Sequence, residues 1–255
     1  RGVVFRYDTV VTDVDFEISQ DSPEKQATSI HIIEAGESKR VDLTADDLLF
    51  MTIGSLTENS DDGDHGTPAK LNTGPAPAWD LWRRIAAKDK AFGNPDVFGA
   101  HIPETKWESA TVTTLDPRIP RYIEKIAQRD PFSGKVVTGG IVSVMDSSWL
   151  MSWTVNRQPH FKKQPKDQIV VWVYGLFPEA VGDFVKRPMQ ECTGEEITQE
   201  WLFHLGVPVD EIPELAGRQQ VRQPLGHGRE PLAPIGDRGL GNRHRAGIRG
   251  VQDEI

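Results

Sequence analysis

A short segment in the second half of the chain groups several kinds of polar side chain that could bind an anion. The segment TVNRQPH, residues 154–160, holds hydroxyl, amide, guanidinium and imidazole donors within seven residues. In an extended strand Thr154 and Asn156 point to the same face, because side chains alternate with a period of two. Pro159 then turns the chain, so that His160 could come back toward that face. Three convergent donors at the end of an apolar pocket suit a carboxylate head group, although polar residues at a strand end more often satisfy loop backbone.

Other ionisable residues are weaker candidates for chemistry. Glu108 lies in a polar and aromatic setting where a buried carboxylate could act as an acid or base, but a surface carboxylate is the commoner case. Asp61, Asp62 and Asp64 could suggest calcium, yet they lack the spacing and the closing Glu of an EF-hand loop, so we predict no metal site. Cys192 is the only cysteine, which excludes an intrachain disulfide and favours a reducing cytoplasm as the location.

Four longer stretches of the sequence are specific enough to be compared directly with known families. They are WESATVTTLD (107–116), RDPFSGKVVTGGIVSVMDSSWLMSWTVNRQPHF (129–161), VVWVYGLFP (170–178) and CTGEEITQEWLFHLGVP (192–208). Together these stretches closely resemble the oleate hydratase family, long called the myosin-cross-reactive antigens. The resemblance covers most of the chain, from about Gly2 to Ala216, and long stretches of this kind are far more specific than a short motif.

The resemblance implies an FAD-binding lyase that adds water across the cis-9 double bond of oleate and related unsaturated fatty acids. The product it implies is a 10-hydroxy fatty acid, formed without net redox change. The implied fold is a fragment of an FAD-binding flavoprotein fold, of mixed α/β (α+β) class, with mixed sheets and a helical cap. The resemblance leaves open a peripheral contact with membranes and a homodimer of the longer protein.

The resemblance also implies roles for individual residues. Thr154, Asn156 and His160 stand where the family places its ligands for the substrate carboxylate. The family's acid, a Tyr, its base, a Glu, and its glycine-rich dinucleotide fingerprint all belong upstream of the region that aligns with Arg1. We therefore expect no catalytic residue within this chain.

A second segment resembles a cofactor-contacting turn of the family. Residues 51–55, MTIGS, are similar to a T-N-G-S turn that lies near the flavin. The similarity implies cofactor contacts from Thr52, Gly54 and Ser55. Ile53 stands where the family has Asn, which removes one amide side chain from this contact.

The elements that must position these residues begin with a β-rich region. Residues 10–18 alternate apolar and polar side chains, and residues 27–33 are rich in β-branched types, which predicts the strands of a meander. The apolar run within residues 43–55 predicts a buried strand that ends in a glycine turn, and Thr44 with Asp47 could instead form a capping box.

Later in the chain, strands and helices alternate. Strands are predicted within 136–154, where the pair Gly139-Gly140 should bend the backbone, and at 169–177. Residues 58–78 are rich in Asp, Gly, Asn and Pro and predict a long surface loop. Helices are predicted at 79–90 (apolar stripe Trp82, Ile85, Ala86), at 116–128 (Ile119, Ile123, Ile126) and from a capping box of Thr193 and Glu196 to a stop at Gly206.

Composition sets the broad class of the protein. The chain has 255 residues, 37% of them hydrophobic and seven of them Trp, which is enough for a globular core. The net charge of -9 disfavours nucleic acid and anionic membrane surfaces as main partners. No apolar run is long enough to predict a membrane span, which needs about 18–20 residues.

The end of the sequence changes character. Residues 217–255 hold eight Gly and seven Arg but no Lys, Phe, Trp or Tyr, so we predict that no core forms there. We assign residues 1–216 to the central part of the family's fold, comprising the substrate-binding region and part of the FAD domain. We interpret 217–255 as a disordered or frameshifted tail, a hypothesis that resequencing of the locus would decide.

Two functional interpretations remain open from the sequence. In the first, the chain is a portion of a hydratase that supplies the carboxylate anchor and has no turnover by itself. In the second, it is an inactive truncated or frameshifted remnant that at most binds fatty acid.

Overall fold

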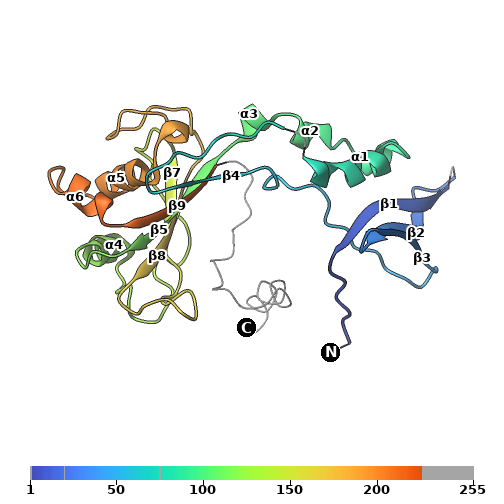
Figure 1. Cartoon of the computed structure of the whole chain (residues 1–255), viewed down its shortest axis with the longest axis horizontal. Helices are drawn as coiled ribbons and strands as arrows, with labels where there is room; N and C mark the ends of the chain where they lie inside the picture. Colours follow the sequence, from blue (N-terminus) through green and yellow to red (C-terminus); the bar gives the residue numbers. More distant parts are fainter. Residues whose placement is uncertain (1, 20, 75, 226–255) are drawn as a thin grey trace. The chain divides into compact units, whose positions relative to one another are not determined.

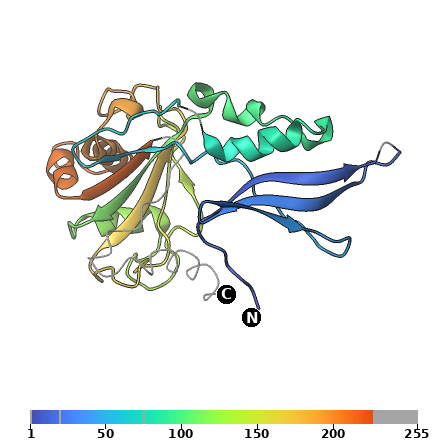
Figure 2. The same ribbon diagram turned by 45° about the vertical axis from the view of Figure 1, so that its right-hand side comes forward.

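The chain forms two compact units. A computed structural model describes residues 2–19, 21–74 and 76–225, and its contacts group residues 2–55 and 76–99 into unit 1 and residues 56–74 and 100–225 into unit 2. Both units contain helices and antiparallel sheets (Figures 1 and 2), so the predicted mixed α/β class is confirmed. No helix in the described part of the chain is long and apolar enough to cross a membrane.

Unit 1 is built on a three-stranded antiparallel meander. Its strands are β1 (Thr9–Ile18), β2 (Lys25–Glu34) and β3 (Glu37–Asp42), in the order β1-β2-β3, which confirms the predicted meander. Ala35 and Gly36 join β2 to β3, and both have positive φ angles, 52° and 85°. Two such residues form the turn whose twist matches that of the flanking strands.

Short helices accompany this sheet. They are η1 (Pro77–Trp79), α1 (Asp80–Ala86), η2 (Lys90–Phe92) and α2 (Asp96–Gly99). The α1 helix confirms the predicted helix but ends four residues earlier than expected, at Ala86 rather than Lys90. Basic side chains of α1 and of the segment after it contact β1: Arg84 Nη1 donates to the Thr12 carbonyl and Lys88 Nζ to the Val14 carbonyl, each at 2.6 Å.

The predicted buried strand within residues 43–55 is wrong. This segment contains neither helix nor strand, and the side chains of Leu48 and Phe50 are 84% and 87% exposed. The Asp47 carboxylate accepts from both the N–H and the hydroxyl of Thr44, at 2.7 and 2.8 Å, which closes a turn after β3. An apolar run is buried only where another element covers it, and no described strand pairs with this one.

Unit 2 contains a six-stranded antiparallel sheet in the order β4-β9-β5-β8-β7-β6. The strands are β4 (Asp61–Asp64), β5 (Glu108–Thr114), β6 (Val142–Ser143), β7 (Met151–Thr154), β8 (Ile169–Gly175) and β9 (Gln220–Leu225). The strands predicted within 136–154 and 169–177 are confirmed in shorter form. The prediction of an uninterrupted surface loop at 58–78 is wrong at β4, where Gly63 is buried and so closely packed that a Cβ would lie 2.5 Å from the Ala69 nitrogen.

The hydrophobic core of unit 2 lies between one face of this sheet and the helices α4, α5 and α6 (Figure 1). The predicted capping box of Thr193 and Glu196 is confirmed at the start of α5. In α4, Ile119 and Ile123 are buried, whereas Ile126 is 40% exposed, so the apolar stripe is narrower than predicted. The helices of this unit are α3 (Ile102–Thr105), α4 (Ile119–Ala127), η3 (Met189–Glu191), α5 (Gly194–His204) and α6 (Ile212–Gly217).

The predicted division of the chain after Ala216 falls inside α6. Beyond it, β9 pairs with β5 on one side and β4 on the other, and Val221 reaches the core. A strand can form in a Gly/Arg-rich region because the ladder bonds come from the backbone, and neighbouring strands supply the partners. Residues 226–255 lie outside the described part, so the frameshift hypothesis for them stays a prediction.

Candidate functional site

The strand that ends at Thr154 presents two different faces. Directly opposed residues share a face of a sheet, so the pair Thr154 and Trp172 lies on one side of β7 and β8 and the pair Trp153 and Val173 on the other. Trp153 and Val173 are buried in the core. Thr154 therefore lies on the face of the sheet that points away from the core.

An aromatic cluster occupies the same face. The aromatic cluster consists of Trp107, Trp172 and Tyr174: the rings of Trp172 and Tyr174 lie 4.8 Å apart, and Trp107 makes edge contacts with them at 6.2 and 6.3 Å. Trp172 is 37% exposed. Large aromatic side chains with free surface are suited to contact an apolar ligand. The apolar surface thus begins directly across the ladder from the Thr154 hydroxyl.

The hydroxyl of Thr154 belongs to a small network with Thr138 and Gly140. Thr154 Oγ1 donates to the Gly140 carbonyl at 3.1 Å and lies 3.0 Å from Thr138 Oγ1. Thr138 Oγ1 donates to the same carbonyl at 2.6 Å. Gly139, with φ of 68°, bends the backbone that carries this carbonyl, as the glycine pair predicted. A hydroxyl can rotate, so Thr154 could redirect its proton to a ligand oxygen.

Asn156 and His160 lie on the exposed loop that follows β7. In the described chain, no hydrogen bond joins Thr154, Asn156 and His160 to one another. The three residues are close in the sequence, but their side chains do not form a hydrogen-bonded group. The backbone N–H of His160 donates to Gln164 Oε1 at 2.8 Å, and its ring lies 4.7 Å from that of Phe161. Both exposed side chains remain accessible to a ligand.

Gln158 holds this loop against the sheet, a role that the sequence did not predict. Its side chain is only 3% exposed, and its amide pairs with both the N–H and the C=O of Val170 at the start of β8, at 3.1 and 3.2 Å. Gln164 Nε2 donates to Gln158 Oε1 at 2.7 Å. A carboxamide carries a donor and an acceptor, so it can replace one peptide group of a ladder. Residue type alone does not distinguish this glutamine from a solvated one.

The predicted cofactor segment lines a groove within unit 1. The groove has a volume of about 640 Å³ and is lined by residues 49–55, the first half of β1 and residues at the start of α1. Thr52, Gly54 and Ser55 all contribute to the lining. Gly54 has φ of 78°, its N–H donates to the Ala78 carbonyl at 3.1 Å, and a Cβ on it would lie 2.6 Å from the Trp79 ring. Gly54 thus has the positive φ that favours glycine, and the assigned turn follows at residues 56–59. The cofactor contacts stay a prediction.

Substitution of Gly54 should destabilise the chain more than substitution of another glycine with a similar backbone. We expect Gly54→Ala to lower the free energy of unfolding by about 2–4 kcal/mol, because it adds a steric clash with Trp79 to the cost of positive φ. Gly36→Ala is the matched control, since φ is 85° there and no atom lies within 4 Å of the new Cβ. In urea denaturation, Gly36→Ala should lower the free energy of unfolding by only about 1–2 kcal/mol. Equal losses would show that Trp79 does not constrain the turn.

The positions of the other ionisable residues in the fold decide between their possible roles. Glu108 is fully buried on the core side of β5, so the expectation of a surface carboxylate is wrong, because the alternation of the strand turns it inward. Burial raises the pKa of the Cys192 thiol to about 12, so this cysteine is a neutral core residue rather than a nucleophile. Asp61 to Asp64 form β4 and, among the described residues, do not gather into a set of three close ligands.

Comparison with known proteins gives a consistent result. The model of the MCRA family matches residues 1–225, a range that includes β9. The chain is 45% identical over 222 residues to an oleate hydratase from Streptococcus pyogenes serotype M49 (strain NZ131), covering 87% of this chain and 37% of that protein. It is 30% identical over 210 residues to a linoleate hydratase from Lactiplantibacillus plantarum, covering 80% of this chain and 37% of that protein. The chain thus spans 37% of the length of the curated relatives it matches.

Proposed function

Because this chain belongs to the MCRA family, we propose that it is the part of a fatty-acid hydratase that holds the carboxylate end of an unsaturated fatty acid such as oleate. The two relatives are named for the hydration of oleate and linoleate, which share a carboxylate head and an unsaturated apolar tail. In the proposed reaction of the longer protein, water adds across the cis-9 double bond and gives a 10-hydroxy fatty acid. The reaction is that of a lyase and involves no net redox change.

One observation carries this proposal: the Thr154 hydroxyl lies directly across the ladder from the aromatic cluster, on the open face of the sheet of unit 2. Thr154 lies directly opposite Trp172 of the aromatic cluster, and Asn156 and His160 follow within the next six residues. A fatty acid has the same two-part character, with a charged oxygen pair at the end of a long apolar chain. The head group would bind at residues 154–160, and the tail would run over the aromatic cluster.

The residues of this chain would bind and orient the substrate. The Asn156 amide and an imidazole N–H of His160 would donate to the carboxylate, and the Thr154 hydroxyl would rotate away from Gly140 to join them. Gln158 and Gln164 keep the loop in place through their contacts with β8 and with the His160 backbone. A fixed head group sets how far along the pocket the double bond lies, which matters because hydration needs an acid and a base at defined carbons. We assign that acid and base to parts of the longer relatives outside the match.

We propose FAD as a cofactor of the longer protein, with an edge contact from the groove of unit 1. Thr52 and Ser55 offer hydroxyls there, and Gly54 lets the backbone turn beside them. The groove contains no glycine-rich phosphate cradle, and Arg84 already donates to the Thr12 carbonyl. The described residues therefore fit one edge of a flavin and not a complete dinucleotide site, and we derive no step through it.

A cytoplasmic location and a homodimer of the longer protein belong to the same proposal. The single cysteine, buried and with a raised pKa, suits a reducing compartment. The dimer, and any peripheral contact with membranes, rests on the family alone.

A comparison of the affinities for oleate and for methyl oleate distinguishes a carboxylate site from adsorption to exposed apolar surface. Isothermal titration of the chain should show that methyl oleate binds at least about 10-fold more weakly, since hydrogen bonds to a charged group contribute about 1.5–3 kcal/mol. Equal affinities would contradict a carboxylate anchor. Absence of binding by both would contradict the proposal and favour an inert remnant.

A further inference from the structure

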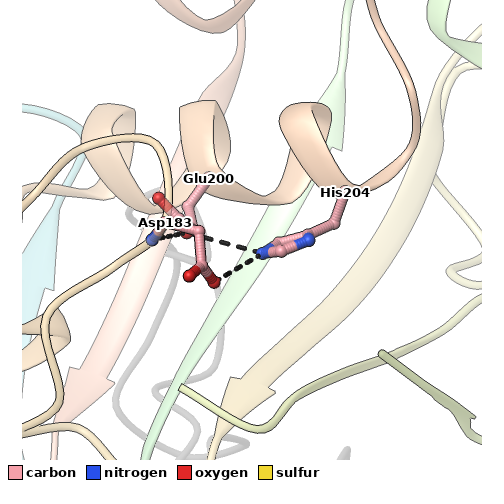
Figure 3. Close-up of side chains that lie close together, drawn as sticks. All are labelled: Asp183, Glu200 and His204. Carbon is pink, nitrogen blue, oxygen red and sulfur yellow. Dashed lines mark hydrogen bonds and ion pairs between the residues drawn. The ribbon is translucent and has the colours of Figure 1, made fainter. Parts of the chain in front are cut away.

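Three potential metal ligands converge where the loop at residues 181–187 meets α5. Figure 3 shows Asp183 on the loop and Glu200 and His204 one turn apart on the helix, with the imidazole edge directed at both carboxylates. His204 Nε2 lies 3.4 Å from Glu200 Oε1 and 3.5 Å from Asp183 Oδ2. The three ligand atoms lie within 4.8 Å of one another. This ligand cluster, Asp183, Glu200 and His204, is well shielded, since the exposed fractions of its side chains are 30%, 0% and 7%.

Both carboxylates are oriented by neighbouring hydrogen bonds. Glu200 accepts from the backbone N–H groups of Asp183, Phe184 and Val185, at 2.5, 2.9 and 2.9 Å. Asp183 accepts from the hydroxyl and the N–H of Ser148, at 2.6 and 2.8 Å. Metal-binding carboxylates are commonly fixed by such an outer set of donors. Each oxygen that faces His204 accepts one such hydrogen bond and keeps the capacity for a further interaction.

The pKa of each carboxylate lies below its ordinary value. Burial by itself would raise the pKa of Glu200, but its contacts with His204 and with the three amides hold the pKa below its ordinary value. Burial acts on the pKa of Asp183 in the same way and is outweighed by the two bonds from Ser148. In the structure, one oxygen of each carboxylate faces the same imidazole nitrogen.

The imidazole nitrogen has no hydrogen-bond partner within the described chain. His204 Nε2 is buried, and the geometry to both carboxylates fails that of a hydrogen bond. Charge-assisted N–H···O bonds have lengths of about 2.7–2.9 Å, well below the separations found here. Atoms that surround a tetrahedral ion at about 2.0–2.2 Å lie roughly 3.3–3.6 Å from one another. The distances from Nε2 to the two oxygens, 3.4 and 3.5 Å, fall within this range.

We propose that Asp183, Glu200 and His204 bind a divalent transition-metal ion of the zinc type. One imidazole nitrogen and two carboxylate oxygens are ligands that such ions accept, and the partial exposure of Asp183 leaves access for a water ligand. The ion would fasten the loop at 181–187 to α5 on the core side of the sheet. Thr154 lies on the other side, so the ion would stabilise unit 2 and take no part in binding the fatty acid.

An ion pair is the competing explanation of the same geometry. A protonated His204 would share its Nε2–H between the two carboxylates, and the cluster would then have no affinity for metal. The two explanations differ in one measurable property, which is stoichiometric binding of a metal ion.

Cobalt(II) is a suitable probe because its visible absorption depends on its ligands. After removal of metal from the purified chain by chelator and dialysis, CoCl₂ titration should give a visible band that saturates at one equivalent and is displaced by ZnCl₂. His204→Gln should abolish the band. His65→Gln, which alters a histidine that pairs with Glu195 at 3.6 Å outside the ligand cluster, should retain it. Zinc should also raise the Tm of the wild-type chain and of His65→Gln, but not that of His204→Gln.

The wild-type titration is decisive even if His204→Gln does not fold. Absence of a saturable band in the wild-type chain would overturn the proposal. A band that persists in His204→Gln would overturn it equally, since the ion would then bind elsewhere. Asp183→Asn is a milder second variant, because it keeps an oxygen that can accept from the Ser148 N–H. It should weaken cobalt binding at least about 10-fold, which is the usual contribution of a hydrogen-bonding partner around a metal site.

Discussion

Replacement of Glu200 by alanine is expected to lower the free energy of unfolding by about 3–5 kcal/mol, one of the largest single-residue effects in this chain. The side chain is fully buried and accepts from three consecutive backbone N–H groups of the loop at 181–187. Its removal leaves these donors without an acceptor and leaves His204 beside one carboxylate instead of two. Chemical denaturation of the variant and the wild-type chain measures the loss.

The neighbouring Glu195 provides the control for this prediction. It lies on the same helix, and its side chain is 38% exposed in a distant ion pair with His65. Glu195→Ala should change the free energy of unfolding by no more than about 0.5 kcal/mol. A loss below about 1 kcal/mol for Glu200→Ala would contradict a buried carboxylate clamp.

The contribution of Glu200 should also depend on pH in a defined direction. Because the pKa of the folded state is below the ordinary value of 4.5, the stabilisation is present at pH above 4.5 and is lost as pH falls through the lower folded-state value. The stability difference between the wild-type chain and Glu200→Gln should therefore narrow below pH 4.5. A difference that widens in acid would contradict the ionised state.

The double variant Asn156→Ala/His160→Ala should weaken oleate binding by about 10- to 100-fold, which corresponds to the loss of one or two hydrogen bonds to a charged group. Both side chains are exposed, so the fold should persist, as circular dichroism can verify. Binding of methyl oleate should change little, because the ester carries no charge for these donors to recognise.

A nearby cation controls for general electrostatic attraction. Lys162 is exposed on the same loop and has no assigned role in the head-group site. Lys162→Ala should leave the affinity for oleate within about twofold, since exposed charges interact weakly through water. A loss equal to that of the double variant would show that the loop attracts anions by net charge and does not bind the carboxylate specifically.

The sequence predicted correctly those elements that are determined by residues close to one another along the chain. The capping box of Thr193 and Glu196 needs only four consecutive residues, and the helix it begins is present as α5. The strand predicted at 169–177 is likewise present as β8, where residues alternate between the buried face and the open face of the sheet. In both elements, the side chains that form the sequence pattern are also the ones that cap the helix or pack in the core.

Features that depend on a distant partner were missed. The apolar run at 43–55 has the composition of a strand, but no strand among the described residues pairs with it. By contrast, β9 has an unpromising composition and pairs with β4 and β5. Gln158 gains its role only from Val170, which the fold brings beside it. Asp183 joins α5 through a loop, so the spacing of Glu200 and His204 alone did not predict the ligand cluster.

The most direct test of the account is to locate a bound fatty acid on the chain. An oleate analogue with a free carboxylate and a photoreactive diazirine in its tail can be cross-linked to the protein, and the labelled peptides identified by mass spectrometry. We predict labels on peptides that contain Trp107, Trp172 or Tyr174, suppressed by excess oleate and by the Asn156→Ala/His160→Ala substitutions. Labels confined to unit 1, or labels that excess oleate does not suppress, would contradict a head-group site at residues 154–160.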